Sequence, residues 1–417
     1  MPTPNAHAVL SPSSASRWLA CTPSARMNEK FTSRFGAKES PFAEEGTKAH
    51  AIGELKIRLA VYQSDEMCAS KLSRMSKAER EFYPGINKHR FDALRADIGD
   101  VDESIEHATD SYCDVVMHKY LMAKAADPTT QLFLEQRVDL GKWVPNSFGS
   151  SDAVIVSDSM LEVIDFKAGR GILVNAHNNP QLRLYALGSV ESFHLLYDFP
   201  YVRYTIVQPR LDNLSEEVMT VEDLLNWAAT EVVEKAKMAW AGTGEFVPGE
   251  HCRFCSAKAV CMARVTQGLK VFEYGLDNPG IISDEQIADI LPYLDAAESW
   301  IQDIRAYAEN QALHGQRFRG YKLVHGKKPN RQWSDTEEVK AQLLRSGYDP
   351  TTFEETKLKA VGAVEKLLGK AAFRALLEPL VHQGEGKLIL VPEDDKRQEY
   401  SSAEAAFSDL LDNTSNE

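Results

Sequence analysis

The chain has 417 residues, of which 43% are hydrophobic and 26% charged. These proportions are typical of a soluble globular protein, and the length favours two or three structural units. No apolar run approaches the about 20 residues that a membrane helix requires, and no secretion signal is recognisable, so we expect a cytoplasmic protein. The net charge of −14 argues against a nucleic-acid partner unless basic groups are concentrated locally.

Helical patterns occupy the chain up to about residue 125. They cover residues 13–63, apart from a loop predicted at about 36–41 (GAKESP), and return across 103–125. The polar, charge-rich stretch between these two segments is also predicted to be helical. We therefore expect a mostly helical region ahead of the first strand.

β-Strand patterns begin at Gln131. The segment QLFLEQRVDL alternates, and two β-rich runs follow it, SSDAVIVSDSM and LEVIDFKAG, joined by a turn at residues 157–159. A helical segment, NPQLRLYALGSVESF, a further strand, YVRYTIVQPRL, and a helix at 221–241 come next. Three strands, a helix and a strand in this order predict a mixed α/β core of modest size.

A long helix is predicted to begin near residue 283. Ser283 and Gln286 form a capping-box pattern at its start. Pro292 lies inside the helical pattern and predicts a kink or a break into two helices. The apolar residues expected on one face of this helix are Ile287, Leu291, Leu294, Ile301, Ile304 and Ala308.

The remaining C-terminal sequence is expected to form an accessory region. Helices are predicted at about 335–346 and 357–381, followed by a short strand, KLILVP. The last residues are polar and acidic, which is typical of a disordered tail. The expected division is a domain at 1–275, a mostly helical α+β accessory region at 276–400, and a tail at 401–417.

Two carboxylates and a lysine fall close together in the predicted β-hairpin. Asp152 opens one strand, and Asp165 and Lys167 close the next. Residues i and i+2 of a strand point to the same face, so Asp165 and Lys167 project together, and hairpin pairing can bring Asp152 beside them. Two carboxylates can hold Mg²⁺ or Mn²⁺. Such an ion polarises a phosphodiester and lowers the pKa of water, which the lysine can orient or help deprotonate.

The alternative is that D-x-K is a commonplace edge-strand pattern with solvated charges. The surroundings favour a functional site, because the run VIDF is otherwise strongly apolar and burying charges there without partners is costly. Gln181 and Tyr185 are spaced i, i+4 in the following helix and so share a face. A lone histidine such as His50 is usually structural or solvated, and its spacing alone does not make it a ligand.

The order of these motifs resembles that of the RecB-like branch of PD-(D/E)XK nucleases. In that branch G-x-x-x-H, G-x-x-D, D-x-K and Q-x-x-x-Y follow one another. The matching pairs here are Gly46 with His50, Gly149 with Asp152, Asp165 with Lys167, and Gln181 with Tyr185. The resemblance implies a restriction-endonuclease-like fold, in which helices flank a mixed sheet.

The resemblance also implies roles for these residues. Lys167 would be the catalytic lysine, and Gln181 and Tyr185 would position that lysine or the DNA strand. Glu45, next to the first motif, would assist. The implied metal ligands are three side chains and one backbone carbonyl, those of His50, Asp152, Asp165 and Phe166.

Three of the six cysteines form a cluster, HCRFCSAKAVC. Cys252, Cys255 and Cys261 have the spacing of metal ligands, but three thiolates leave a tetrahedral zinc site or an iron–sulfur cluster one ligand short. Cys21, in SRWLACTPSAR, or His251 could complete the set. In a large chain without an export signal we do not expect disulfides.

This split cysteine set resembles that of AddB-type and CRISPR-adaptation nucleases of the same superfamily. Those proteins carry one cysteine before the nuclease core and a C-x-x-C-x₅-C-like triad after it, and they bind a 4Fe–4S cluster. The resemblance implies such a cluster at Cys21, Cys252, Cys255 and Cys261. Its role would be structural, because closing a loop of more than 230 residues removes substantial chain entropy. Zinc and ordinary buried thiols are the alternatives.

A second resemblance covers most of the chain. The segments SPSSASRWLACTPSAR, EEGTKAH and GYKLVHGKKPNRQW resemble an uncharacterised nuclease-like family common in bacteriophages and prophages. That likeness implies a role in phage recombination or replication, in the cytoplasm of a bacterial host. It also implies a single-strand annealing or recombination protein as a partner.

Basic and aromatic residues are interleaved in the segment QRFRGYKLVHGKKPNRQW. Basic groups contact phosphates and aromatic rings stack on unpaired bases, so this segment could bind DNA in spite of the acidic net charge. A solvated hairpin whose aromatic residues pack on a neighbouring helix is an equally good interpretation. The basic residues are Arg317, Arg319, Lys322, Lys327, Lys328 and Arg331.

The sequence as a whole predicts a deoxyribonuclease that uses Mg²⁺ or Mn²⁺, an exonuclease that processes DNA ends in recombination, repair or replication. No phosphate-loop motif, G-x-x-x-x-G-K-[ST], accompanies the nuclease motifs. Two alternatives stay open. One is a catalytically inactive DNA-binding or assembly protein on a nuclease-derived fold, and the other is an RNA-directed nuclease.

Overall fold

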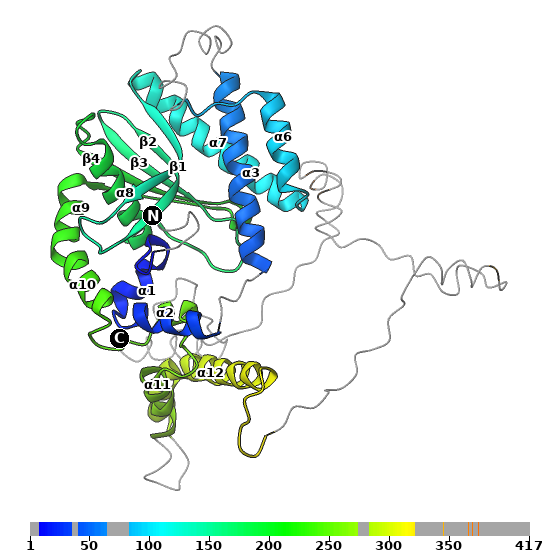
Figure 1. Ribbon diagram of the computed structural model, residues 1–417, viewed down its shortest axis with the longest axis vertical. Coiled ribbons are helices and arrows are strands. Elements are labelled where there is room, and N and C mark those ends of the chain that lie inside the picture. Colours follow the sequence, from blue (N-terminus) through cyan, green and yellow to red (C-terminus); the bar gives the residue numbers. More distant parts are fainter. Residues whose placement is uncertain are drawn as a thin grey trace, which may run out of the picture. The chain divides into compact units, whose positions relative to one another are not determined.

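The chain divides into two compact units, Met1–Val324 and His325–Glu417. A computed structural model, drawn in Figure 1, describes parts of the first unit and single positions of the second. The described residues are 8–35, 41–64, 83–273 and 283–321, together with positions 345, 366, 369 and 374.

The described elements form, in chain order, a helical N-terminal part, a sheet with a crossover helix, and a helical C-terminal part. Three short 3₁₀ turns are η1, η2 and η4, and η3 is a π-helical turn. In chain order the elements are η1 (Pro12–Ser14), α1 (Ala15–Ala20), α2 (Ser24–Phe35), α3 (Pro41–Ser64), α6 (Lys88–Ile98), α7 (Glu103–Ala126), β1 (Gln131–Asp139), β2 (Phe148–Val156), β3 (Met160–Phe166), α8 (Pro180–Phe193), β4 (Tyr201–Gln208), η2 (Pro209–Leu211), β5 (Asn213–Thr220), α9 (Val221–Trp227), η3 (Ala228–Val232), α10 (Val233–Ala241), η4 (Glu250–Phe254), α11 (Met262–Glu273) and α12 (Asp284–Leu313).

The strands form one mixed sheet in the order β1-β2-β3-β4-β5. All neighbours are antiparallel except β3 and β4, which run parallel because α8 crosses over between them. The predicted α/β class, the first four strands and the crossover helix are confirmed. The fifth strand was not predicted, because NLSEEVMT is polar and forms a half-exposed sheet edge.

Helices cover both faces of the sheet. On one face α8 packs on the sheet together with the N-terminal residues, in a core that includes Trp18 and Leu184. On the other face α3 and α7 pack on the sheet around Phe166 and Tyr112 (Figure 1). Alternate residues of β3 supply the two cores, since Val163 belongs to the first and Ile164 to the second.

The first helices are fastened to α10 and the residues that follow it. Arg26 of α2 donates from Nε to the carbonyl oxygen of Trp240 at 2.6 Å, and its guanidinium lies 4.1 Å from the centroid of the Trp240 ring. The hydroxyl of Thr22 donates to the carbonyl oxygen of Thr243 at 2.6 Å. Residues more than 200 positions apart are thereby brought together, and the cysteines lie in this region.

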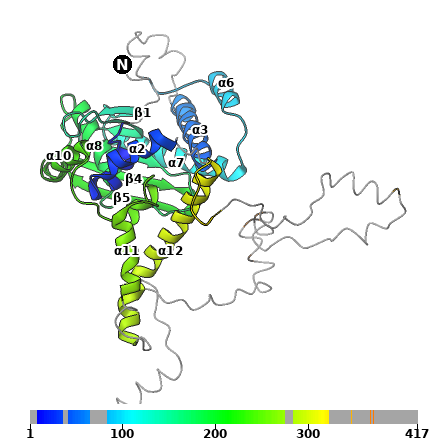
Figure 2. The ribbon, with the colours of Figure 1, turned by 60° about the horizontal axis from the view of Figure 1, so that its bottom comes forward.

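Helices α11 and α12 lie side by side, as Figure 2 shows. The capping box at Ser283 and Gln286 is confirmed. The helix continues through Pro292, so of the two predicted outcomes, a kink or a break, the break into two helices is wrong. On its predicted apolar face, four of the six residues are exposed: Ile287, Leu291, Leu294 and Ile304.

Several predicted elements lie outside the described residues. They are the loop at about 36–41 in most of its length, the helices at 335–346 and 357–381, the strand KLILVP and the tail at 401–417. The predicted domain boundary at residue 275 falls inside the first compact unit, which also contains α12. Within the described part of the chain, no helix has the length and apolar character needed to cross a membrane.

The packing of α8 on β1 allows a stability test. A Cβ atom at Gly188 would lie 2.6 Å from the Cβ atom of Val138 and 3.3 Å from the carbonyl oxygen of Asp139. We expect Gly188→Ala to force the helix away from the strand and to lower the free energy of unfolding by about 1–3 kcal/mol. Urea unfolding followed by circular dichroism measures this.

Gly171→Ala is the matched control, because a Cβ atom there meets nothing within 4 Å. Equal unfolding midpoints for the two variants would contradict the described packing of α8 on β1.

Candidate functional site

The site forms where β2 and β3 separate. Their ladder ends at the pair Ala153–Ile164, so Asp152 and Asp165 lie one step beyond its last pair. The backbone N–H of Phe166 donates to Oδ2 of Asp152 at 2.7 Å, replacing a ladder bond with a bond to a side chain. Strand β3 stays paired with β4 up to its end. One buried and one half-buried carboxylate therefore lie at the end of the β2–β3 ladder.

Lys167 and two residues of α8 surround Asp165. The Lys167 Nζ atom lies 2.9 Å from Oδ2 of Asp165 in an ion pair and donates to Oε1 of Gln181 at 3.3 Å. Gln181 donates from Nε2 to Oδ1 of Asp165 at 3.1 Å and to the Tyr185 hydroxyl at 3.4 Å. The side chain of Gln181 thus bridges the lysine, the carboxylate and the tyrosine.

His50 reaches the carboxylates from α3. Its Nδ1 atom lies 3.1 Å from Oδ1 of Asp152. Its ring lies against Phe166, with 5.3 Å between the ring centroids, and Phe166 in turn stacks on Tyr112 at 4.5 Å. The aromatic packing orients the imidazole, because Phe166 is fully buried and fixed between α3 and α7.

Glu135 of β1 is a member of the site that sequence reasoning missed. One ligand atom each of His50, Glu135 and Asp152 lies within 4.8 Å of the other two. Glu135 has a φ of 49°, a left-handed conformation that is uncommon outside glycine. Leu134 and Gln136 on either side keep their ladder partners on β2. Glu135 lies between them, at the level of Asp152, and no sequence signal distinguishes it from other polar strand residues.

Burial and neighbouring charges perturb the protonation of these groups. Burial and the charge of Asp152 raise the pKa of Asp165, although Lys167 opposes this rise. Burial acts on Asp152 in the same sense, but the nearby His50 and the bond from Phe166 lower its pKa. Desolvation and the charge of Asp152 raise the pKa of Glu135 to about 7. Three carboxylates therefore share this site with one lysine and one histidine.

The donor set fits a divalent cation. Carboxylate oxygens suit Mg²⁺ and Mn²⁺, and an imidazole nitrogen is also a common metal ligand. A cation here would favour the charged forms of Asp165 and Glu135, whose pKa values are raised by burial and by the charge of Asp152. Of the four implied ligands, His50 and Asp152 are in contact, and Glu135 rather than Asp165 completes the group of ligand atoms within 4.8 Å. Ligation by Asp165 and by the Phe166 carbonyl stays a prediction.

The motif glycines and Glu45 have different outcomes. Gly149 has a steric role, because a Cβ atom there would lie 2.9 Å from the Tyr185 ring and 3.0 Å from Pro12. A Cβ atom at Gly46 would meet nothing within 4 Å, so its place in the motif has no steric explanation. The carboxylate of Glu45 is held in an ion pair with Arg210.

The four cysteines of the split set line one small cavity, together with His251. Cys21 follows α1, Cys252 lies in η4, and Cys255 and Cys261 lie in the turns after it. All four are free thiols. Among the described residues, His50, Glu135 and Asp152 form the one group of three or more ligand atoms within 4.8 Å, so no three of these sulfur atoms are that close.

The predicted basic segment is described only in part. Arg319 is exposed, and Arg317 is exposed just after α12. Lys322, Lys327, Lys328 and Arg331 lie outside the described residues. The proposed DNA contacts of this segment therefore stay a prediction.

Comparison with known proteins assigns the family. A sequence profile described as "Protein of unknown function (DUF2800)" matches residues 7–398. The chain belongs to the DUF2800 family. Among solved structures, the crystal structure of SSO0001 is 13% identical, with the match covering 57% of this chain and 94% of that chain at a TM-score of 0.22. A TM-score this low supports no inference about the DUF2800 chain.

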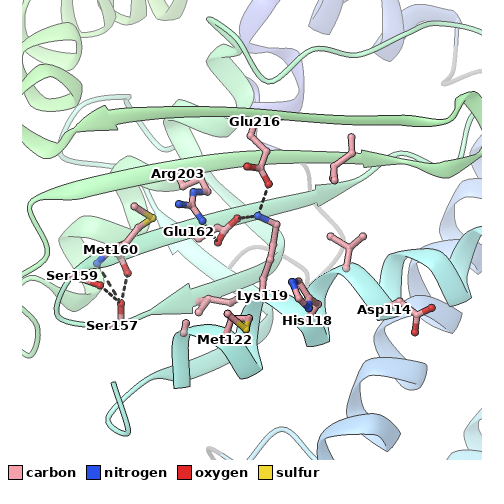
Figure 3. A pocket seen from close by; sticks show the side chains of 14 residues that line it. Asp114, His118, Lys119, Met122, Ser157, Ser159, Met160, Glu162, Arg203 and Glu216 are labelled. Carbon is pink, nitrogen blue, oxygen red and sulfur yellow. Dashed lines mark hydrogen bonds and ion pairs between the residues drawn. The ribbon is translucent and has the colours of Figure 1, made fainter. Parts of the chain in front are cut away.

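This DUF2800 protein has a second hollow, on the face of the sheet that carries α7 (Figure 3). Glu162 is buried there and accepts from the Thr205 hydroxyl at 2.7 Å. Lys119 pairs with Glu162 at 2.7 Å and also with Glu216. Glu162 and Asp165 lie on opposite faces of β3, so the two sites are separate. Lys119 pairs with both glutamates, which is typical of a structural ion cluster.

The His50–Asp152 contact generates a pH prediction. Burial of the imidazole opposes its protonation, but the charge of Asp152 and the hydrogen bond to it raise the pKa of His50 to about 9. In an unfolded chain the imidazole of a histidine has a pKa of about 6.5. The contact therefore stabilises the fold fully below pH 6.5, and this contribution is lost as pH rises through about 9.

In chelator-treated protein, NMR titration of the histidine rings should show His50 still protonated at about pH 8. Asp152→Asn should lower the pKa of His50, whereas Asp158→Asn, in the exposed turn between β2 and β3, should leave it unchanged. A His50 that titrates at its ordinary value in the unmodified protein would contradict the described contact.

Proposed function

We propose that this DUF2800 protein is a metal-dependent DNA nuclease of the PD-(D/E)XK type, in its RecB-like branch. The observation that carries the proposal is the convergence of residues from three distant segments. His50 lies 3.1 Å from Asp152, and Lys167 lies 2.9 Å from Asp165 while contacting Gln181. A commonplace edge-strand D-x-K would leave these charges solvated, but Asp165 is 3% exposed.

Each side chain has a definite part in phosphodiester hydrolysis. His50, Asp152 and Asp165 would hold a Mg²⁺ or Mn²⁺ ion, with Glu135 as a further donor. The ion would polarise the phosphodiester and lower the pKa of its bound water. Lys167, kept charged by Asp165, would orient the attacking water and stabilise negative charge that develops on the phosphate. Gln181 fixes the position of both Lys167 and Asp165.

The proposed substrate is DNA, processed from its ends during recombination, repair or replication in a bacterial or phage setting. The order of the motifs supports DNA as the substrate. The same resemblance supports a location in the cytoplasm of a host cell and a single-strand annealing protein as a partner. RNA is the competing substrate class. The acidic net charge of −14 means that DNA affinity would depend on local basic groups and would fall steeply with salt.

A catalytically inactive DNA-binding protein on the same fold is the second candidate. Its support is the exposed basic residues after α12. The geometry of the carboxylate site weighs against it. Asp165 carries a raised pKa next to a lysine and a second carboxylate, an arrangement that costs stability and is typical of functional sites.

Removal of one carboxylate tests the nuclease proposal. Asp165→Asn keeps the shape of the side chain but removes a metal-binding charge, so we expect cleavage of end-labelled DNA in Mn²⁺ to fall by more than about a hundredfold. Single- and double-stranded substrates and a labelled RNA identify the substrate class.

Asp158→Asn, an exposed position on the same hairpin, should cleave as the unmodified protein does. Cleavage that survives Asp165→Asn would place the activity elsewhere. DNA binding without cleavage in the unmodified protein would favour the inactive alternative.

We propose in addition that Cys21, Cys252, Cys255 and Cys261 bind a 4Fe–4S cluster. The donor set is four thiols that line one cavity, and no three of the sulfur atoms belong to a group of ligand atoms within 4.8 Å among the described residues, which favours a polynuclear group over a single ion. Tetrahedral zinc with Zn–S bonds of about 2.3 Å places its sulfur ligands about 3.8 Å apart. The cluster would join the N-terminal helix α1 to the segment after α10 and so close the domain.

Anaerobic purification tests the cofactor. We expect a coloured protein with about four iron and four sulfide per chain, and Cys255→Ser should lose most of both. Cys113→Ser is the control, because Cys113 is a buried free thiol on α7, in the core on the other face of the sheet. A colourless protein containing one zinc would contradict the cluster and support the Cys₃His or Cys₄ alternative.

A further inference from the structure

We infer that Arg17 is the charge-compensating residue of the cysteine centre, and that this centre carries a net negative charge when loaded. The inference rests on the proposed binding of a metal group at the four cysteines. It adds to that proposal a residue that no motif identifies.

Arg17 is placed inside the cysteine cavity by the helix that leads to Cys21. The two residues are four positions apart, so they share a face at the end of α1. The guanidinium donates from NH1 to the carbonyl oxygen of Phe254 at 3.2 Å. Phe254 lies between Cys252 and Cys255, so the charged end of Arg17 reaches the turn that carries two of the thiols.

The side chain is buried without a counterion. Arg17 is 7% exposed, and its Nε atom is buried with no hydrogen-bond partner. Among the described residues no carboxylate forms an ion pair with it. An arginine keeps its charge in proteins, and burying that charge unpaired is costly.

Another arginine at the same cavity shows what a satisfied side chain looks like here. Arg264 is also 7% exposed and lines the cavity, but it donates to Oδ2 of Asp303 at 2.6 Å and to the carbonyl oxygen of Lys258 at 3.0 Å. Its charge is neutralised by an aspartate. Around Arg17 the cavity is lined instead by Cys21, Cys252 and Cys255.

Arg17 therefore lies among the cysteines of this cavity with no carboxylate partner in the described part of the chain. A metal group bound through four thiolates would supply the negative charge that neutralises the buried guanidinium of Arg17. If that group is a cluster, reduction adds a further negative charge, which Arg17 would stabilise.

The test compares Arg17→Met with Arg17→Lys and Arg253→Met in the anaerobically purified full chain. Arg253 follows Cys252 directly but is exposed, so solvent screens its charge. The readouts are loss of the visible chromophore in excess chelator and the midpoint potential in an anaerobic redox titration. Circular dichroism of each variant reports folding independently of the metal group.

We expect Arg17→Met to lose the chromophore about 10- to 100-fold faster than the unmodified protein and to have a more negative midpoint potential. Arg17→Lys should retain most of both properties, and Arg253→Met should not differ from the unmodified protein. If Arg17→Met loses the chromophore at the rate of the unmodified protein and has the same midpoint potential, the inference is overturned. It is also overturned if Arg253→Met changes both properties as much as Arg17→Met does. If Arg17→Met does not fold, Arg17→Gln takes its place in the same comparison: a potential below that of Arg253→Met supports the inference, and an equal one overturns it.

The cofactor proposal fails separately. If the unmodified protein holds zinc, iron and sulfide are absent, but the same variants are compared by zinc release, and a faster release in Arg17→Met still supports the inference. If the unmodified protein binds neither group, both the cofactor proposal and this inference are overturned.

Discussion

The bond from the Phe166 backbone to the Asp152 carboxylate is the interaction on which the rest of the candidate site depends. If the β2–β3 ladder continued by one pair, Asp152 and Asp165 would oppose each other as like charges, which destabilises a sheet. The ladder ends instead, and Asp152 accepts a hydrogen bond from the Phe166 backbone, although its charge still acts on Asp165. Phe166 then fills the core beside Tyr112, while Asp165 and Lys167 project to the other face, toward α8.

Much of the fold follows from sequence pattern, because hydrophobic periodicity is strong wherever an element is buried on one face or both. That is why β1 to β4 and α8 were predicted, while the half-exposed β5 was not. Asp165 and Lys167 could be found from their i, i+2 spacing on a strand. Glu135 could not, because its place in the site depends on a left-handed backbone that no pattern encodes. His50 was recognised only through family resemblance, since contact between α3 and β2 is a tertiary feature.

The cysteine cavity raises the same issue at longer range. The spacing within HCRFCSAKAVC indicates a metal site, but nothing local connects it to Cys21, more than 200 residues earlier. The connection is made by packing of α1 and α2 on α10, through contacts such as those of Arg26 with Trp240. Arg17 was missed for a further reason. An arginine on a short helix is ordinarily solvated, and its importance is visible only once its burial and its lack of a carboxylate partner are known.

The N-terminal residues connect the two candidate sites physically. At one end of this short segment, Cys21 lines the cysteine cavity. At the other end, Pro12 and the ring of Tyr185 would lie 3.0 Å and 2.9 Å from a Cβ atom placed on Gly149. The carbonyl oxygen of Leu10 accepts from the Ser147 hydroxyl at 2.6 Å. Tyr185 accepts from Gln181, which holds Lys167. A metal group that anchors α1 through the cysteines would therefore also hold Pro12 near Tyr185, whose hydroxyl contacts Gln181. In this way a structural centre can influence the geometry of Lys167 and Asp165 without contacting the substrate.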